Sequence, residues 1–113
     1  MDLVAGNDTT HGTVLVEIAK LIKQAREHSR WRELDTAERL ASEARELART
    51  QLGEKHQSYA YALQEHGIIL ESQDKIVEAR DAYMASMEIL EPLLGNSHPD
   101  TLWLFERLYH LFR

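Results

Sequence analysis

Apolar and small residues recur at helical spacing along most of the chain. One example is Val14, Ile18, Leu21 and Ala25, which share one face of a helix with 3.6 residues per turn. No stretch alternates between apolar and polar residues with the period of two that marks a strand. The sequence therefore predicts an all-α fold, with helices over about residues 14–28, 37–52, 57–72, 75–93 and 98–113.

Short polar motifs predict where these helices begin and end. Thr13 is a candidate cap for the first helix, and Asp35-Thr36-Ala37-Glu38 resembles a capping box at the start of the second. Gly53 and Gly95 follow the second and fourth helices, where a glycine can adopt the positive φ that ends a helix. Ser97 is the candidate cap of the last helix, and Pro99 suits its first turn.

The chain contains an internal repeat. The segment from Leu52 to His56 recurs from Leu94 to His98, so that Gly95 follows Gly53 by 42 residues. The same register pairs further apolar and small positions: Leu21 with Leu63, Leu34 with Ile76, Ala37 with Ala79, Ala44 with Ser86, and Leu47 with Ile89. Each period holds two helices joined by short loops, and such hairpins stack into an α-solenoid.

The expected organisation follows from this register. Residues 1–12 are predicted to be a flexible segment, and residues 13–113 a single domain. The domain would contain two repeats, at about 14–55 and 56–97, and a terminal helix at 98–113.

The small and aromatic positions within each repeat carry a family resemblance. Gly67, Leu70, Ala79, Tyr83 and Ser86 are spaced as in tetratricopeptide repeats, which have a small residue halfway along the first helix. The junction from Leu94 to Asp100, Leu-Gly-Asn-Ser-His-Pro-Asp, is similar to that of the kinesin-light-chain branch of this family. The resemblance covers about residues 14–113 and implies tetratricopeptide-type hairpins, two full repeats plus a terminal helix.

The resemblance also implies a function. Tetratricopeptide domains bind peptides or protein segments in a concave groove lined by the first helix of each repeat, so the chain is expected to be a non-catalytic adaptor or scaffold. The positions that match the groove and are expected to bind the partner are Ile22, Arg26, Tyr61, Gln64, Ile68, Glu71, Trp103, Glu106 and His110. The alternative is that these residues are only the solvent-facing side of a scaffold.

Two ligand types known for this family fit the sequence poorly. Members that clamp a terminal carboxylate use Lys, Arg and Asn side chains, whereas this chain offers Ile22, Trp103 and Glu65 beside Arg26 and Arg107. Cargo-binding kinesin light chains carry Asn near the middle of each first helix, and those places hold no Asn here. The resemblance therefore implies a protein-binding groove without identifying the ligand.

Composition narrows the possible functions further. The chain has a net charge of −6, which argues against general nucleic-acid binding, and it has no cysteine. It contains no apolar run of the roughly 18 residues that span a bilayer, so we expect a cytoplasmic protein that does not bind membranes. The histidines form no metal-ligand motif, and no catalytic motif is present. We expect neither an enzyme nor a cofactor, and a shared structural role for His56 and His98 at equivalent turns.

The terminal helix is apolar on all sides, and such helices are usually buried. Its large side chains Leu104, Leu108, Leu111 and Phe112 are expected on a face that a following helix would cover. Either the array continues in a longer chain, or another surface covers this face. The second case gives the alternative function, an assembly protein in which this helix drives self-association, and predicts a homodimer.

Overall fold

The computed structural model describes the backbone of residues 2–112 and the side chains of residues 12–112. Within these residues the chain forms only helices, and no strand is present. This confirms the all-α prediction. The five helices are α1 (Asp2–Arg30), α2 (Leu34–Leu52), α3 (Gln57–Ser72), α4 (Ile76–Leu94) and α5 (Pro99–Phe112).

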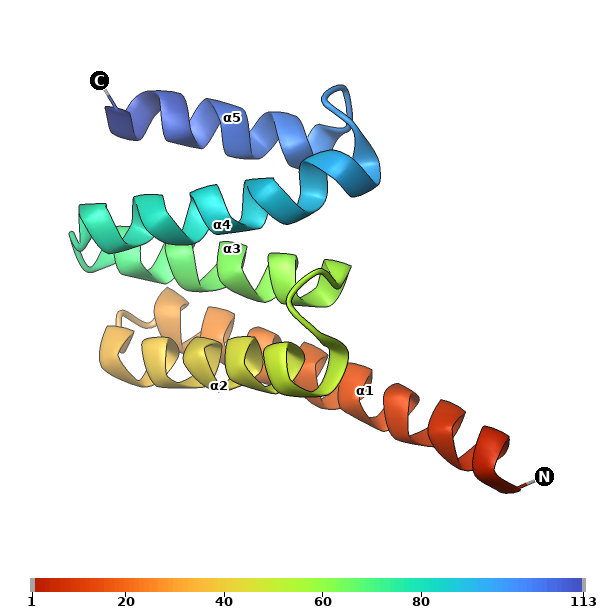
Figure 1. The fold of residues 1–113 in the computed structure, drawn as a ribbon. Coiled ribbons are helices and arrows are strands. Elements are labelled where there is room, and N and C mark those ends of the chain that lie inside the picture. The colour runs from red at the N-terminus through yellow and green to blue at the C-terminus, as the bar shows by residue number, and fades with distance from the viewer. Residues whose placement is uncertain (1, 113) are drawn as a thin grey trace.

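The helices are stacked in chain order (Figure 1). The antiparallel pair α1 and α2 lies at one end, the pair α3 and α4 follows, and α5 lies on α4 at the other end. α1 also contacts α3, so it reaches from the first pair to the second. None of the five helices, over the residues described, is long and apolar enough to cross a bilayer.

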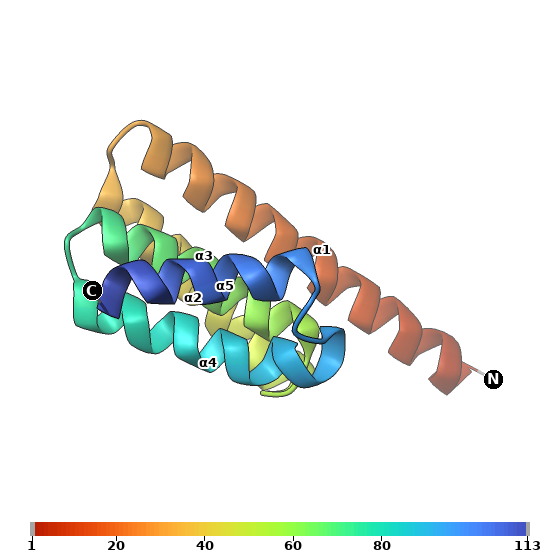
Figure 2. The same cartoon turned by 90° about the horizontal axis from the view of Figure 1, so that it is seen from above.

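The first helix begins earlier than expected. It includes Thr13, which is therefore not its cap, and its N-terminal turns extend beyond the other helices (Figure 2). The prediction of a flexible segment over residues 1–12 concerns mobility, which the helix bounds do not test. The side chains of residues 1–11 lie outside the described part.

Small residues allow α3 and α4 to pack closely. A Cβ atom added at Gly67 would lie 2.7 Å from Cε1 of Tyr83, so the tyrosine ring occupies the space that any other side chain would need. Ser86 donates a hydrogen bond of 2.8 Å to the backbone carbonyl of Ala60 at the same contact. Tyr83, Ser86 and Ala60 are fully buried. The small residues that the repeat register aligns thus lie where the helix backbones approach each other.

Glycines end α2 and α4 as predicted. Gly53 has φ 103° and ψ 160°, and Gly95 has φ 91° and ψ 164°. This combination is open almost only to glycine. In both cases the glycine N–H donates to a carbonyl of the last helical turn.

Histidines cap α3 and α5. Nδ1 of His56 accepts a hydrogen bond from the Ser58 N–H at 3.0 Å, and Nδ1 of His98 accepts one from the Asp100 N–H at 3.1 Å. This confirms a shared structural role for the two histidines. The prediction that Ser97 caps the last helix is wrong, because α5 begins one residue later than that cap would require.

The predicted capping box at the start of α2 does not form. α2 begins at Leu34 after Glu33, whose side chain makes no capping hydrogen bond within the described chain, and Asp35 lies in the first turn. Glu38 bonds instead to His66 on α3 and Lys75 before α4, at 3.3 and 3.1 Å. Contacts with the neighbouring hairpin therefore prevail over the local cap.

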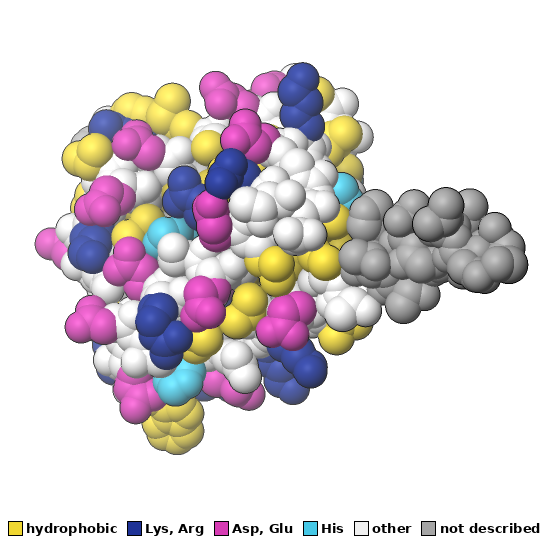
Figure 3. Space-filling model, turned by 60° about the horizontal axis from the view of Figure 1, so that its bottom comes forward, with side chains coloured by type: hydrophobic (Ala, Val, Ile, Leu, Met, Phe, Trp, Pro, Cys, Tyr) yellow, Lys and Arg dark blue, Asp and Glu magenta, His cyan; other side chains and the backbone are white. Residues whose placement is uncertain are grey.

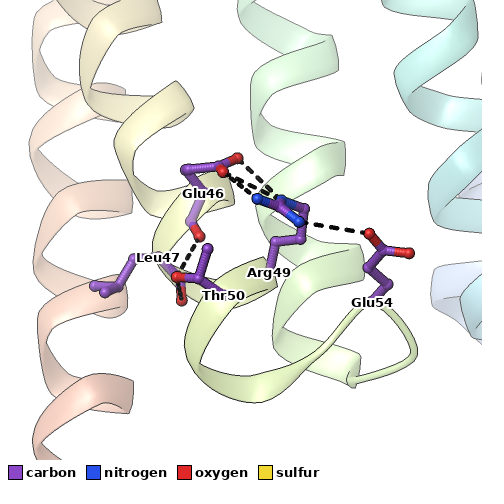
Figure 4. A network of polar contacts seen from close by, with 5 residues as sticks. All are labelled: Glu46, Leu47, Arg49, Thr50 and Glu54. Atoms are coloured by element: carbon purple, nitrogen blue, oxygen red, sulfur yellow. Dashed lines mark hydrogen bonds and ion pairs between the residues drawn. The ribbon is translucent and has the colours of Figure 1, made fainter.

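The C-terminal end of α2 is held by a polar network (Figure 4). Arg49 donates to Glu46 one turn earlier and lies 3.6 Å from Glu54 in the following loop. Thr50 donates to the Glu46 carbonyl at 3.0 Å. The Glu46, Arg49 and Glu54 side chains are 59%, 39% and 70% exposed, so water screens these ion pairs and they contribute little to stability.

The orientation of α5 corrects the prediction for its four apolar residues. Leu104 is fully buried, and Leu108 and Leu111 pack against the cluster formed by α3 and α4. The expectation that these three leucines lie on an open face is wrong, because this is the side that α5 turns toward α4. Phe112 is 59% exposed, as expected. The other large residues exposed on α5 are Leu102, Phe105 and Tyr109.

Candidate peptide-binding groove

A hollow of about 340 Å³ is lined by residues of α3, α4 and α5. Three of the expected partner-binding residues, Ile68, Glu71 and Trp103, line it together with Ser72, Tyr83 and Arg107. Ile68 and Glu71 come from α3, one turn apart, and Trp103 comes from the first turns of α5. The structure therefore brings together residues from two of the helices expected to form the groove.

Aromatic rings and a charged pair form the walls of this hollow. The ring of Trp103 meets that of Tyr83 edge to face, with centroids 5.6 Å apart. The Arg107 guanidinium lies 5.8 Å from the centre of the Trp103 ring. It also donates to Glu71 at 3.4 Å. The tryptophan thus contacts both a buried aromatic ring and a cation.

Tyr83 and Glu71 connect this wall to the core. The Tyr83 hydroxyl donates to Glu71 at 2.9 Å. Burial raises the pKa of Tyr83 far above its ordinary value, and the hydrogen bond to Glu71 raises it further. The phenol therefore stays protonated and acts as a donor at all physiological pH values. Glu71 accepts from both Tyr83 and Arg107, so its carboxylate is held in one position.

Tyr61 joins α3 to the start of α5. Its hydroxyl donates to the Asp100 carboxylate and accepts from the Gln57 amide at 3.3 Å. Burial raises the pKa of Tyr61, and the bond to Asp100 adds to this. The ring is half-buried against the same cluster as Trp103. Tyr61 therefore anchors the groove wall in addition to presenting part of its ring at the surface.

Arg26 and Glu65 join α1 to α3. The guanidinium of Arg26 donates to Glu65 at 2.5 Å, and this hydrogen bond raises the pKa of the arginine. Glu65 is buried while Arg26 is largely exposed, so water screens only one partner. Ile22, one turn before Arg26, is half-buried against Val14, Ile18 and other apolar residues of the first hairpin. Both arginines near the groove are thus paired with carboxylates.

The remaining expected residues lie apart from the hollow. Gln64 is half-buried on α3, and Glu106 and His110 are exposed on α5. Glu106 lines a second, wider hollow with Pro99, Leu102, Trp103, Phe105 and Tyr109. The nine positions therefore do not form one site: three share the hollow between α3 and α5, and the rest lie along the neighbouring surfaces.

Four residues of the site were not among the expected binding residues. Tyr83, Ser72 and Arg107 line the hollow, and Asp100 holds Tyr61. The repeat register gave no signal for them, since it places Arg107 at the position of Glu65, whereas Glu65 pairs with Arg26 and Arg107 pairs with Glu71.

A second polar cluster lies between α2, α3 and α4. His66 is buried there, with Nδ1 3.3 Å from Arg45 and Nε2 3.3 Å from Glu38. Because Arg45 can only donate, Nδ1 accepts and Nε2–H donates to Glu38. Burial lowers the pKa of His66, although the bond to Glu38 opposes this. Among the described residues, no three His, Cys, Asp or Glu side chains converge as a metal site would require.

No protein-family model matches the chain, and no curated protein is significantly similar to it.

Proposed function

We propose that this chain is a tetratricopeptide-type interaction module that binds a peptide or protein segment along α1, α3 and α5. The repeat of 42 residues, the order of antiparallel helix pairs and the close contact of Gly67 with Tyr83 support this architecture. In such a module the first helix of each pair lines the groove. The single observation that carries the proposal is the hollow between α3 and α5, which lies between two of these helices.

The hollow is suited to an apolar anchor side chain. Ile68 and Trp103 offer apolar surface, while Glu71 and Arg107 at its edge offer one acceptor and several donors to a peptide backbone. Its volume of about 340 Å³ is at the lower end of ligand sites, which suits one or two side chains better than a cofactor. Tryptophan and arginine are also the residues most often responsible for affinity at protein interfaces.

Charge pairing further defines the ligand. Arg26 is neutralised by Glu65, and Arg107 is paired with Glu71. A terminal carboxylate would lie close to one of these glutamates, whose negative charge would repel it. The groove therefore favours an internal segment with an apolar anchor over a segment held by its C-terminal carboxylate.

Peptide selection followed by matched tryptophan variants tests this function. Peptides from a displayed random library would be selected on the folded protein, and their dissociation constants measured for Trp103→Ala and Trp31→Ala. Trp31 is 76% exposed at the turn between α1 and α2, outside the hollow, so it controls for the loss of an indole. We expect Trp103→Ala to weaken binding at least about 30-fold, as loss of an interface anchor does, and Trp31→Ala to leave it unchanged.

Chemical-shift mapping supplies the second readout. Bound peptide should shift backbone amides of α3 and α5 around Ile68, Glu71 and Trp103. Circular dichroism would show that Trp103→Ala keeps its helix content. Selected peptides that bind both variants equally, or that shift only residues outside the hollow, would contradict the proposed groove.

A further inference from the structure

The outer side of α5 carries an apolar stripe at the end of the helix stack. It consists of Leu102, Phe105, Tyr109 and Phe112, which are exposed by 50%, 44%, 65% and 59%. Phe112, at one end of the stripe, also contacts α4, because the Arg80 guanidinium lies 5.1 Å from the centre of its ring. We call these four residues the end face. Their spacing of three, four and three residues is that of a coiled-coil seam. Seen from above, α5 lies over the rest of the stack, and no other helix is drawn over it (Figure 2).

The internal repeat indicates that a helix packs on the end face. The 42-residue register aligns it with Ala60, Leu63, Gly67 and Leu70 of α3. All four of these α3 residues are buried, and Ala60, Gly67 and Leu70 contact or cluster with α4. The equivalent surface of α5 has the same apolar character without a covering helix among the described residues.

Side-chain size shows that this helix differs from α4. α4 approaches α3 closely because Ala60 and Gly67 are small, with the Tyr83 ring against Gly67. At the equivalent positions α5 has Leu102 and Tyr109. A helix packed at the distance of α4 would collide with these side chains. The end face is therefore suited to a helix that also carries large apolar residues. The side chains of the two helices would interlock at coiled-coil spacing, with the helix axes further apart than those of α3 and α4.

We propose that a second copy of this chain covers the end face, with the two α5 helices antiparallel across a two-fold axis. In this arrangement Phe105 of one copy meets Tyr109 of the other, and Leu102 meets Phe112. Each pair joins one large apolar residue to another, so the stripe is complementary to itself. Phe112 of the second copy also falls over the wide hollow of about 820 Å³ that begins at Pro99 and Leu102.

The position of α5 makes this contact sterically accessible. It forms the last layer of the stack, so two copies can meet end to end while their α1–α4 layers point away from each other (Figure 1). The opposite end differs in character. There the surface mixes acidic and basic side chains, with smaller apolar areas between them (Figure 3).

The buried area suits a moderate, concentration-dependent dimer. Taking about 200 Å² for an aromatic side chain, Phe105, Tyr109 and Phe112 expose roughly 300 Å² per copy. Two copies, with Leu102 and the rim residues Pro99 and Glu106, approach the ~1,000 Å² typical of a specific interface. Each copy carries a charge of −6, so added salt should strengthen the dimer by screening the repulsion.

Sedimentation equilibrium over low-micromolar to millimolar protein tests the proposal. We expect the wild-type mass to rise from monomer to dimer, and Phe105→Glu to raise the dissociation constant at least about 30-fold. The control is Val77→Glu, which adds the same charge at a residue of α4 that is 59% exposed. This control should dimerise as the wild type does. A wild-type protein that stays monomeric at millimolar concentration would overturn the proposal.

A mixing experiment tests the antiparallel register. The Phe105→Lys and Tyr109→Glu variants should each be monomeric, because each puts two charges against apolar residues in its own dimer. Mixed together, the two variants should associate. In the mixed dimer the introduced lysine at position 105 of one copy faces the introduced glutamate at position 109 of the other, and the second contact keeps Phe105 against Tyr109. Both variants change exposed residues, and circular dichroism would confirm that they fold. Folded variants that fail to associate when mixed would refute this register.

Discussion

Replacing Gly67 with alanine tests the packing of α3 against α4 most directly. The new Cβ would lie 2.7 Å from Cε1, 2.9 Å from Cδ1 and 3.2 Å from Cζ of Tyr83. The first two distances are shorter than real contacts allow, so the ring or a helix must move. The ring cannot move freely, because its hydroxyl is bonded to Glu71 and its edge meets Trp103.

Two opposing effects set the magnitude. Overpacking a tight core costs about 1–3 kcal/mol, while alanine is favoured over glycine inside a helix by about 1 kcal/mol. We therefore expect Gly67→Ala to lower the free energy of unfolding by up to about 2 kcal/mol. Gly67→Leu, with three more carbon atoms in the same space, should lower it further.

Urea unfolding followed by circular dichroism measures this difference. Gly12 provides the control, because it lies inside α1 with no atom within 4 Å of its added Cβ. Gly12→Ala should stabilise the protein by up to about 1 kcal/mol through helix propensity alone. The two alanine substitutions should thus have opposite signs.

A double-mutant cycle with Tyr83→Leu separates the steric term from other effects. Without the ring, Gly67→Ala should become neutral or stabilising, and the difference is the coupling between the two residues. The first repeat already has an alanine at both aligned positions: Ala25 aligns with Gly67 and Ala41 with Tyr83, and both alanines are buried. If Gly67→Ala stabilises the wild-type protein as much as Gly12→Ala does, the contact at Gly67 is not tight.

Three further predictions concern pH, helix capping and the orientation of α5. The pKa of His66 is lower in the folded state than its ordinary value of about 6.5. The contribution of neutral His66 to stability is therefore complete above that pH and is lost as the pH falls below it. The melting temperature should drop between about pH 7.5 and 5.5, and it should drop less in the His66→Gln variant. His56→Ala should cost about 0.5–2 kcal/mol in urea unfolding, because the Ser58 N–H loses its acceptor, and His56→Asn should restore most of it. Leu108→Glu should reduce helix content and unfold at lower urea, since Leu108 packs against the core, whereas Tyr109→Glu, at a 65% exposed residue, should keep the wild-type helix content.

Local chemistry in the sequence determined the helices and two of their ends. The apolar period of α2, α3 and α4 predicts those helices to within a few residues, and Gly53 and Gly95 end two of them. The 42-residue register, which aligns Gly67 with Ala25, also indicates a close helix contact at Gly67. These features depend on residues close together in the chain. The spacing of apolar residues and the backbone freedom of glycine are therefore sufficient to predict them.

Capping shows where local patterns lose to tertiary contacts. Ser97 and Asp35 are good caps by residue type, yet His98 caps α5 and Glu38 leaves its capping box to bond His66 and Lys75. The His98 cap is itself local, two residues from the Asp100 N–H, whereas His66 and Lys75 come within reach of Glu38 only after folding. A side chain with several possible partners chooses by the whole environment, which the sequence pattern does not contain.

The candidate binding surfaces were decided almost entirely by tertiary structure. Arg26 and Glu65 are 39 residues apart, and Glu71 and Arg107 are 36 apart, so the pairs depend on how the hairpins stack. The terminal helix gives the clearest case, because it is apolar on all sides and its period cannot say which side is covered. α4 packs against the side of α5 that carries Leu104, and Leu102, Phe105 and Tyr109 are exposed as a result. Helical periodicity fixes which residues share a face, but only packing against another helix decides which face is buried.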